Sequence, residues 1–203
     1  RFGRIYGAYV NVFWPRPQSY YDLVEWRGTL EFDGGAFMNQ ACHFVDLLYW
    51  LVGDVDTVMA ITATQARRIE VEDSGSAVLR FCNGAIGSIN VSMLIYQESQ
   101  EGSVTIVGEK GTAKIGGIAV NKLEKWEFSD SDDNDKMIMD FSYDPPDVYG
   151  VGHVAYYRNV LDVLQGKCEP NTDGRSGRKS LELILAIYKS AQNGVRVSLP
   201  LES

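Results

Sequence analysis

Hydrophobic and polar residues alternate over much of the chain, which is the pattern of β-strands with one buried face. The first such run, residues 4–14, is rich in β-branched and aromatic residues. Further runs occupy residues 55–66, 74–82, 85–95, 102–107, 112–115 and 120–128. Asn83-Gly84 and the GEKG stretch at residues 108–111 separate neighbouring runs, so both predict hairpins between antiparallel strands.

Three other stretches repeat apolar residues at three- and four-residue steps, which is typical of helices. They cover residues 36–52, 149–164 and 175–193, and the glycines Gly53, Gly166 and Gly194 follow them. Together the elements predict an α+β fold. Its sheet is large, mixed but mostly antiparallel, with helices packed on one face and the other face free for a partner.

A proline-bounded stretch lies between the first strand and the first long helix. Pro15 and Pro17 predict an extended loop that holds Arg16 and Gln18. An arginine among aromatic residues suits a phosphate or sugar ligand, because the guanidinium forks onto phosphate. A solvated surface loop fits the same composition equally well.

The first long helix carries an unusual row of side chains. Asn39, His43, Asp46 and Trp50 are four, three and four residues apart, so they share one helix face. In a helix this apolar, which we expect to be largely buried, such a row is either a set of satisfied core hydrogen bonds or the lining of a cleft. The Gly34-Gly35 pair at its entrance allows close approach of a ligand and favours the cleft. His43 is then a candidate for proton transfer, as is the other histidine, His153.

Composition narrows the classes of function. The 203 residues are 45% hydrophobic and carry a net charge of −8, which argues against binding nucleic acid or an anionic membrane. Cys42, Cys82 and Cys168 are far apart and form no disulfide framework, so a reducing cytoplasm is expected. The sequence has no HExxH motif and no Cys/His cluster, so we expect no metal site. The acidic stretch at residues 129–135 predicts a solvated loop.

The segment GGAFMNQACHFVDLLYWLVG at residues 34–53 resembles the motif GGxxxDxxxHxxDxxxxLxG. That motif belongs to the C-terminal domain of the Gfo/Idh/MocA oxidoreductases. The resemblance extends to GEKGT at residues 108–112 and to DGRSGRKSLELILAIYKSA at residues 173–191. It implies that residues 1–203 form the substrate-binding and oligomerisation domain of a dehydrogenase. NAD or NADP would be bound mainly by an N-terminal Rossmann domain that is absent from this chain, as is the catalytic lysine.

The resemblance also implies roles for individual residues. His43 matches the catalytic histidine that takes the hydroxyl proton. Asn39 stands where the family usually has Asp, and because an amide cannot accept a proton, it would only orient a hydroxyl or the imidazole. Four further residues are expected to contact substrate: Arg16, Gln18, Tyr149 and His153.

RPQSYYD at residues 16–22 and IEVEDSG at residues 69–75 are most similar to one branch of the family. Those enzymes oxidise the 3-hydroxyl of UDP-N-acetyl-2-amino-2-deoxyglucuronate in bacterial surface-polysaccharide (O-antigen) synthesis. The expected partners are therefore a UDP-sugar and further copies of the chain, as a homo-dimer or homo-tetramer joined through the sheet. Two alternatives stay open: a dehydrogenase of the same family acting on another sugar or inositol, and a non-catalytic scaffold that associates through its sheet.

Overall fold

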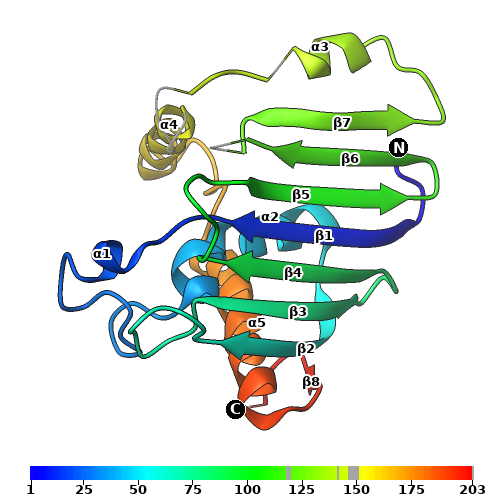
Figure 1. The fold of residues 1–203 in the computed structure, drawn as a ribbon. Helices are drawn as coiled ribbons and strands as arrows, with labels where there is room; N and C mark the ends of the chain where they lie inside the picture. Colours follow the sequence, from blue (N-terminus) through cyan, green and yellow to red (C-terminus); the bar gives the residue numbers. More distant parts are fainter. Residues whose placement is uncertain (118–119, 141, 146–150, 203) are drawn as a thin grey trace.

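A single eight-stranded sheet organises the fold in the computed structural model, which describes residues 1–117, 120–140, 142–145 and 151–202. The strand order is β7-β6-β5-β1-β4-β3-β2-β8, as Figure 1 shows. Among the described pairings, β1 and β4 are parallel and the others are antiparallel. The strands are β1 Ile5–Phe13, β2 Val55–Ala63, β3 Ser74–Phe81, β4 Ile86–Ser92, β5 Glu101–Gly108, β6 Gly111–Gly116, β7 Lys122–Phe128 and β8 Val197–Ser198.

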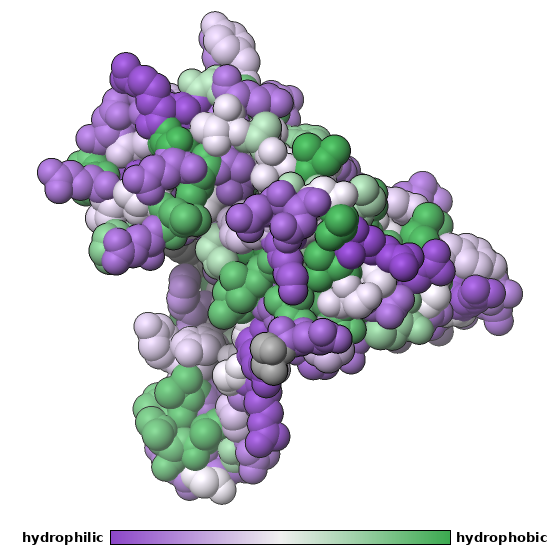
Figure 2. All heavy atoms as spheres, turned by 90° about the horizontal axis from the view of Figure 1, so that it is seen from below, coloured by the Kyte–Doolittle hydropathy of each residue, from purple (hydrophilic) through white to green (hydrophobic). Residues whose placement is uncertain are grey.

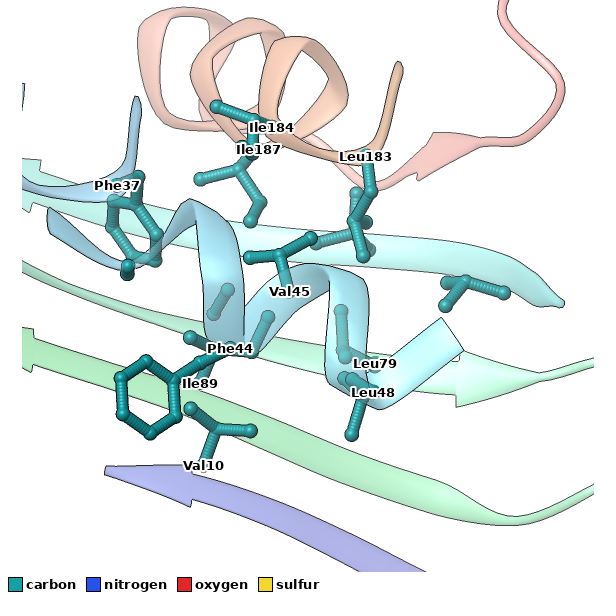
Figure 3. Packing of buried hydrophobic residues seen from close by; sticks show 14 of the residues in the cluster. Val10, Phe37, Phe44, Val45, Leu48, Leu79, Ile89, Leu183, Ile184 and Ile187 are labelled. Carbon is teal, nitrogen blue, oxygen red and sulfur yellow. The ribbon is translucent and has the colours of Figure 1, made fainter. Parts of the chain in front are cut away.

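The helices differ in how they relate to the sheet. They are α1 Gln18–Tyr21, the π-helix η1 Ala36–Gln40, α2 Cys42–Val52, α3 Asp135–Met139, α4 Gly152–Leu164 and α5 Gly174–Asn193. Helices α2 and α5 pack on one face of the sheet, α2 against β1 and β5 and α5 against β2, and Figure 3 shows buried side chains of both helices beside the strands. Val45 and Leu48 of α2 are fully buried in this layer. Removing most of a side chain such as Leu48 would cost about 2–5 kcal/mol, because the close-packed layer would be left with a cavity.

The predicted α+β fold with a mixed sheet and helices on one face is confirmed. Both predicted hairpins are present, with β3 paired to β4 across Gly84 (φ +86°) and β5 paired to β6. Alternation succeeded as a predictor because it records burial: Leu79 faces the core, while its neighbour Val78 is exposed. Helix α5 also ends as predicted, at Gly194 in the left-handed conformation.

Two local predictions were wrong. The extended loop after Pro17 is instead the short helix α1. The helix over residues 36–52 is divided at Ala41 into the π-helix η1 and the α-helix α2. The predicted acidic loop is present and exposed over residues 129–134. Only Asp135 enters a helix, α3, where its carboxylate pairs with the Arg1 guanidinium and accepts a hydrogen bond from the Trp126 indole. Arg1 is far from the acidic stretch in sequence and Trp126 precedes it, so the composition of the stretch alone does not reveal these partners.

The face of the sheet opposite α2 and α5 is not covered by any described element. Cross-strand neighbours Tyr9, Ser88, Val78 and Met59 form one row on it across β1, β4, β3 and β2. Val78 is 58% exposed, and Ile61 in the next row is 75% exposed. A row of apolar side chains on an open sheet is a surface suited to association.

Helix α4 stands apart from the sheet. None of its residues is buried, and Val154 and Leu161 are among its exposed apolar side chains. Seen end-on in Figure 1, α4 forms the projection at the lower edge of Figure 2, where apolar side chains gather on one side. No described helix is long and apolar enough to cross a membrane.

Candidate active site

His43 and Asn39 line the same cavity, which has a volume of about 610 Å³. Its walls come from distant parts of the sequence: the end of β1, α1, the junction of η1 with α2, the segment that enters β5, and β7. The lining residues are Trp14, Arg16, Tyr20, Asn39, Gln40, His43, Ser99, Gln100, Glu101, Gly102, Gly117 and Glu124. A histidine, an arginine and two carboxylates thus face a common cavity.

A second depression, of about 480 Å³, lies on the open face of the sheet. It is lined by residues such as Phe13, Ile61, Ser74 and Asn90, and none of its lining residues is ionisable. It therefore offers no group that could transfer a proton at neutral pH, which leaves the cavity beside His43 as the better candidate for the active site.

The local backbone explains how Asn39 and His43 come to face that cavity. Gly34 adopts a positive φ of +71°, which turns the chain into η1. The backbone N–H of Ala41 then bonds to the carbonyl oxygen of Ala36 over 3.0 Å, a π-type step of five residues. Such π-turns inside helices are frequent at functional sites. Here the wider turn carries Asn39, and α2 begins immediately before His43.

Asn39 is held by hydrogen bonds on both sides of its amide. Its Nδ2 donates to the carboxylate of Asp33, and its Oδ1 accepts from Nε2 of Gln40. The Gln40 amide also lies 3.4 Å from the hydroxyl oxygen of Tyr20. The chain Asp33–Asn39–Gln40–Tyr20 fixes the amide at the cavity wall, which suits a group that orients a ligand.

Arg16 reaches the cavity above aromatic rings. Its guanidinium carbon lies 5.5 Å from the ring centroid of Trp14 and 5.1 Å from that of Tyr20. Arg27 also contacts the Tyr20 ring, at 4.1 Å, and donates from Nη1 to the Tyr20 carbonyl oxygen. The Nε atoms of both arginines are buried and lack a hydrogen-bond partner among the described residues. Two cations around one tyrosine make this side of the cavity attractive to an anion.

The opposite side of the cavity carries carboxylates that are already paired. Nζ of Lys114 lies 3.0 Å from Oε1 of Glu101 and 3.0 Å from Oε2 of Glu124. Burial opposes ionisation of Glu101, but the Ser103 hydroxyl and Lys114 outweigh it and hold the pKa of Glu101 below its usual value. Glu101 therefore remains charged, and the carboxyl oxygens of Glu101 and Glu124 are placed to accept hydrogen bonds from sugar hydroxyls.

The structure brings three of the six predicted site residues together and leaves two elsewhere, while one lies outside the described residues. Arg16, Asn39 and His43 share the cavity. Gln18 does not line it, because its amide spans the Asp22 carboxylate and the backbone N–H of Arg68. His153 is exposed on α4 and does not line the cavity either, and Tyr149 lies outside the described residues. A role in substrate contact stays a prediction for these three.

The predicted polar row does not act as a unit. Asp46 accepts a hydrogen bond of 2.6 Å from the Ser180 hydroxyl of α5, so it joins two helices. Trp50 is 79% exposed and lies away from the cavity lining. Together with His43, both lie on the exposed side of α2, while the other residues of the helix are buried or half-buried, so the expectation of a largely buried helix holds for all but this side.

Several lining residues escaped the sequence analysis. Glu101 and Glu124 come from strands whose alternation predicts only a sheet, and the fold alone brings them to His43. Arg27 and Asp33 precede the glycine pair without a recognisable motif, although an aspartate directly before Gly34-Gly35 is a usable signal. In the part of the chain that the structure describes, no three His, Cys, Asp or Glu residues cluster closely enough to hold a metal ion.

Comparison with known proteins decides the family. The profile of the Gfo/Idh/MocA "oxidoreductase family, C-terminal alpha/beta domain" matches residues 1–199. The chain belongs to this oxidoreductase family. The matching region includes every residue of the cavity lining, so the site described above is part of the family domain.

Two solved structures of this family are similar over the whole chain. One is the WlbA dehydrogenase of Bordetella pertussis in complex with NADH and UDP-GlcNAcA, with 59% identity and a TM-score of 0.94. The other is the WlbA dehydrogenase of Chromobacterium violaceum with the same two ligands, with 56% identity and a TM-score of 0.91. This chain is covered completely in both cases, and it spans 58% and 57% of those chains.

A more distant relative has a different substrate in its name. The D-apiose dehydrogenase of Rhizobium rhizogenes is 26% identical over 203 residues, covering 95% of this chain. The match spans 58% of that enzyme. The chain thus corresponds to somewhat more than half the length of each of these three relatives.

Proposed function

We propose that this chain is the substrate-binding part of an NAD-dependent dehydrogenase that oxidises the 3-hydroxyl of a UDP-N-acetylamino-sugar uronate. The observation that carries the proposal is the cavity that unites His43, Asn39 and Arg16. Its support is the 59% identity to a dehydrogenase solved with NADH and UDP-GlcNAcA. As the resemblance implies, the pathway would be bacterial surface-polysaccharide synthesis in the cytoplasm.

In this proposal His43 accepts the proton of the sugar 3-hydroxyl while the hydrogen on the same carbon leaves as hydride. The C–O bond becomes a carbonyl, so the alcohol is oxidised to a ketone. Asn39 can orient the hydroxyl, because hydrogen bonds to Asp33 and Gln40 fix its own amide. The imidazole of His43 is exposed at the cavity and can pass its proton to solvent.

The charges of the cavity fit an anionic sugar nucleotide. Arg16 can present the end of its guanidinium to a diphosphate or a carboxylate, since within the described structure its only side-chain hydrogen bond runs from Nη1 to the Pro15 carbonyl oxygen. The Glu101–Lys114–Glu124 group offers acceptors for sugar hydroxyls, and Lys114 offsets one of its two negative charges. The overall charge of −8 therefore does not prevent an anion from binding here.

The cofactor expected for this reaction is NAD, which accepts the hydride when bound. The sequence contains no GxGxxG turn, so we assign most of its binding to a further domain of the whole protein. This chain would contribute to cofactor binding through the open side of the cavity at His43, where the substrate's reacting carbon would face outward.

The test is a substitution of His43 in the full-length enzyme with UDP-GlcNAcA as substrate. We expect His43→Ala to lower kcat by about 10²–10⁴-fold, the usual contribution of a general base. The matched control is Trp50→Ala, which changes an exposed residue of the same helix outside the cavity and should leave kcat within about two-fold. Equal turnover by wild type and His43→Ala would exclude His43 as proton acceptor.

The D-apiose dehydrogenases support a second candidate, oxidation of a free sugar by the same site. The two candidates differ at Arg16, because a free sugar has no anionic group for the guanidinium to bind. Calorimetric titration with UDP-GlcNAcA and with D-apiose separates them. Binding of UDP-GlcNAcA that weakens in Arg16→Ala supports the nucleotide sugar, whereas preference for D-apiose in both proteins supports the free sugar.

Oligomerisation is the other part of the proposal. The open sheet face with Tyr9, Met59, Ile61 and Val78 is the surface through which two copies would associate. If the chain were instead a scaffold without catalysis, it would form the same oligomer but bind no sugar nucleotide.

A further inference from the structure

The connector between β2 and β3 carries Glu72 near its end, a residue of the IEVEDSG segment to which the proposed chemistry gives no role. Glu72 is 8% exposed, which is rare for a glutamate. Its Oε1 accepts hydrogen bonds from the backbone N–H of Phe37 over 2.9 Å and from the hydroxyl of Tyr188 over 3.0 Å. The two hydrogen-bond donors stabilise this carboxylate in the interior, where burial without partners would cost free energy.

The two side chains complete the N-terminus of the helix that carries Asn39. Four consecutive backbone N–H groups begin this helix and have no acceptor within it. Those of Gly35 and Met38 donate to the Tyr188 hydroxyl at 3.2 and 3.3 Å. That of Ala36 donates to the Glu72 carbonyl oxygen at 3.1 Å, and that of Phe37 to the Glu72 carboxylate. All four are thus satisfied by two residues from outside the helix.

The glycine pair is explained by the same contact. A Cβ atom on Gly35 would lie 1.7 Å from Oε2 of Glu72, so no other residue fits while the carboxylate is in place. A Cβ atom on Gly34 would lie 2.6 Å from Cβ of Met38. The GG of the motif therefore makes room for the cap, and the ligand cavity beside His43 does not include either glycine.

We propose that Glu72 and Tyr188 are positioning residues for the reaction at His43, because together they fix the axial position and rotation of the η1–α2 unit. The inference rests on the proposed function for the reaction and on the hydrogen bonds for the geometry. Neither residue touches the cavity, so both act through the helix start. Tyr188 connects this start to α5, and Glu72 connects it to the segment that enters β3.

Only a few residues of one helical unit separate the capped helix start from His43. Phe37 and Ala41 are fully buried on either side of Asn39, so a shift of the helix start is transmitted to Asn39 and then to His43. A misplacement of about 1 Å can cost on the order of 10²-fold in rate. The Tyr188 hydroxyl stays protonated, since burial first and the charge of Glu72 second raise the pKa of Tyr188. It therefore keeps its donor to Glu72 and both of its acceptor positions.

The experiment uses three variants of the full-length enzyme. Tyr188→Phe removes the hydroxyl that caps Gly35 and Met38 but keeps the ring. Glu72→Gln is the conservative variant, because its amide oxygen can still accept from Phe37 and Tyr188. Ser190→Ala is the matched control: it deletes a buried hydroxyl of the same helix α5, one that bonds to Ala60 and Val195 away from the cavity.

Two readouts need no substrate. The first is amide hydrogen exchange of residues 35–45, and the second is the imidazole NMR signal of His43, identified by its loss in His43→Gln. We expect Tyr188→Phe to speed the exchange and to shift the His43 signal, and Ser190→Ala to change neither. An unshifted His43 signal in Tyr188→Phe overturns the positioning role, whatever the enzyme's substrate proves to be.

The kinetic readout tests the consequence for the reaction. With UDP-GlcNAcA we expect Tyr188→Phe to lower kcat roughly ten-fold, with KM within about two-fold, and Glu72→Gln to retain kcat within about three-fold. Loss of kcat in Ser190→Ala equal to that in Tyr188→Phe would mean a general stability effect and would refute the inference. If wild type itself fails to turn over the sugar nucleotide, the proposed function fails, and the NMR result alone decides the positioning role.

Discussion

The Nε atom of Arg67 donates a hydrogen bond of 2.6 Å to the backbone carbonyl oxygen of Arg16, 51 residues away in sequence. Arg16 faces the cavity, whereas Arg67 lies in the connector between β2 and β3. The buried Asp73 shapes that connector by accepting the backbone N–H groups of Gln65, Ala66 and Arg67 at 2.9–3.1 Å. The connector that caps the helix of His43 thus also holds the loop of Arg16.

The first prediction concerns this link. Arg67→Ala removes the hydrogen bond to the Arg16 carbonyl and leaves the loop free to shift. A hydrogen bond from a charged donor contributes about 1.5–3 kcal/mol, so the KM for UDP-GlcNAcA should rise roughly ten-fold or more while kcat changes less. Steady-state kinetics of the full-length enzyme measures both constants.

The neighbouring arginine supplies the control for that experiment. Arg68 contacts the same loop through its backbone N–H, which donates a hydrogen bond of 2.8 Å to Oε1 of Gln18. Its exposed side chain is not needed for this contact. Arg68→Ala removes the same charge from the connector and should leave KM within about two-fold. A matching rise of KM in both variants would assign the effect to net charge instead of the Arg67 hydrogen bond.

The second prediction concerns pH. Burial raises the pKa of Glu72 above its usual value of 4.5, even though the N–H of Phe37 and the hydroxyl of Tyr188 lower it in part. Because the folded state then binds this proton more tightly than the unfolded state, wild type loses stability as pH rises from about 4.5 through the raised value. Glu72→Gln has no such proton to lose.

Thermal unfolding between pH 4 and pH 8 provides the measurement. The Tm of Glu72→Gln relative to wild type should increase with pH through this interval and then stay level. A difference that is constant with pH would show that Glu72 ionises in the folded protein as easily as in the unfolded chain. A difference that decreases with pH would mean that its hydrogen bonds outweigh its burial.

Alternation and helical periodicity predicted most of the fold because both patterns reflect which residues of a strand or helix face the core. They could not predict that β1 pairs in parallel with β4, since no local pattern identifies a strand's partner. The π-turn at η1 was missed for the same reason. Its helix start depends on Glu72 and Tyr188, which lie 35 and more residues away from the N–H groups that they cap.

The candidate site was predictable where chemistry and spacing coincide in one element. Asn39 and His43 are four residues apart and do share the cavity, and Arg16 was found because an arginine among aromatics is a recognisable ligand pattern. Gln18 belongs to the same pattern, but the structure uses its amide to hold Arg68. Composition shows that a polar side chain is present, but tertiary contacts decide whether it remains available to a ligand.

The third prediction concerns the open face of the sheet. Met59 and Val78 are direct cross-strand neighbours on β2 and β3, 48% and 58% exposed, with their side chains on the uncovered face. If two copies associate through this face, Val78→Lys places a charge in the interface that must lose its water, at a cost of several kcal/mol per buried charge. We expect the variant to be monomeric, or of half the wild-type mass, in light scattering after gel filtration.

A lysine on the helix side of the molecule serves as the control. Leu185 of α5 is 45% exposed, similar to Met59, but it lies on the layer opposite the open sheet face. Leu185→Lys should therefore keep the wild-type mass. Circular dichroism must show that Val78→Lys is folded, since its neighbours Ala77 and Leu79 belong to the core. A folded Val78→Lys with unchanged mass would show that the copies do not associate through this face. The interface would then lie on another apolar surface, such as the exposed side of α4.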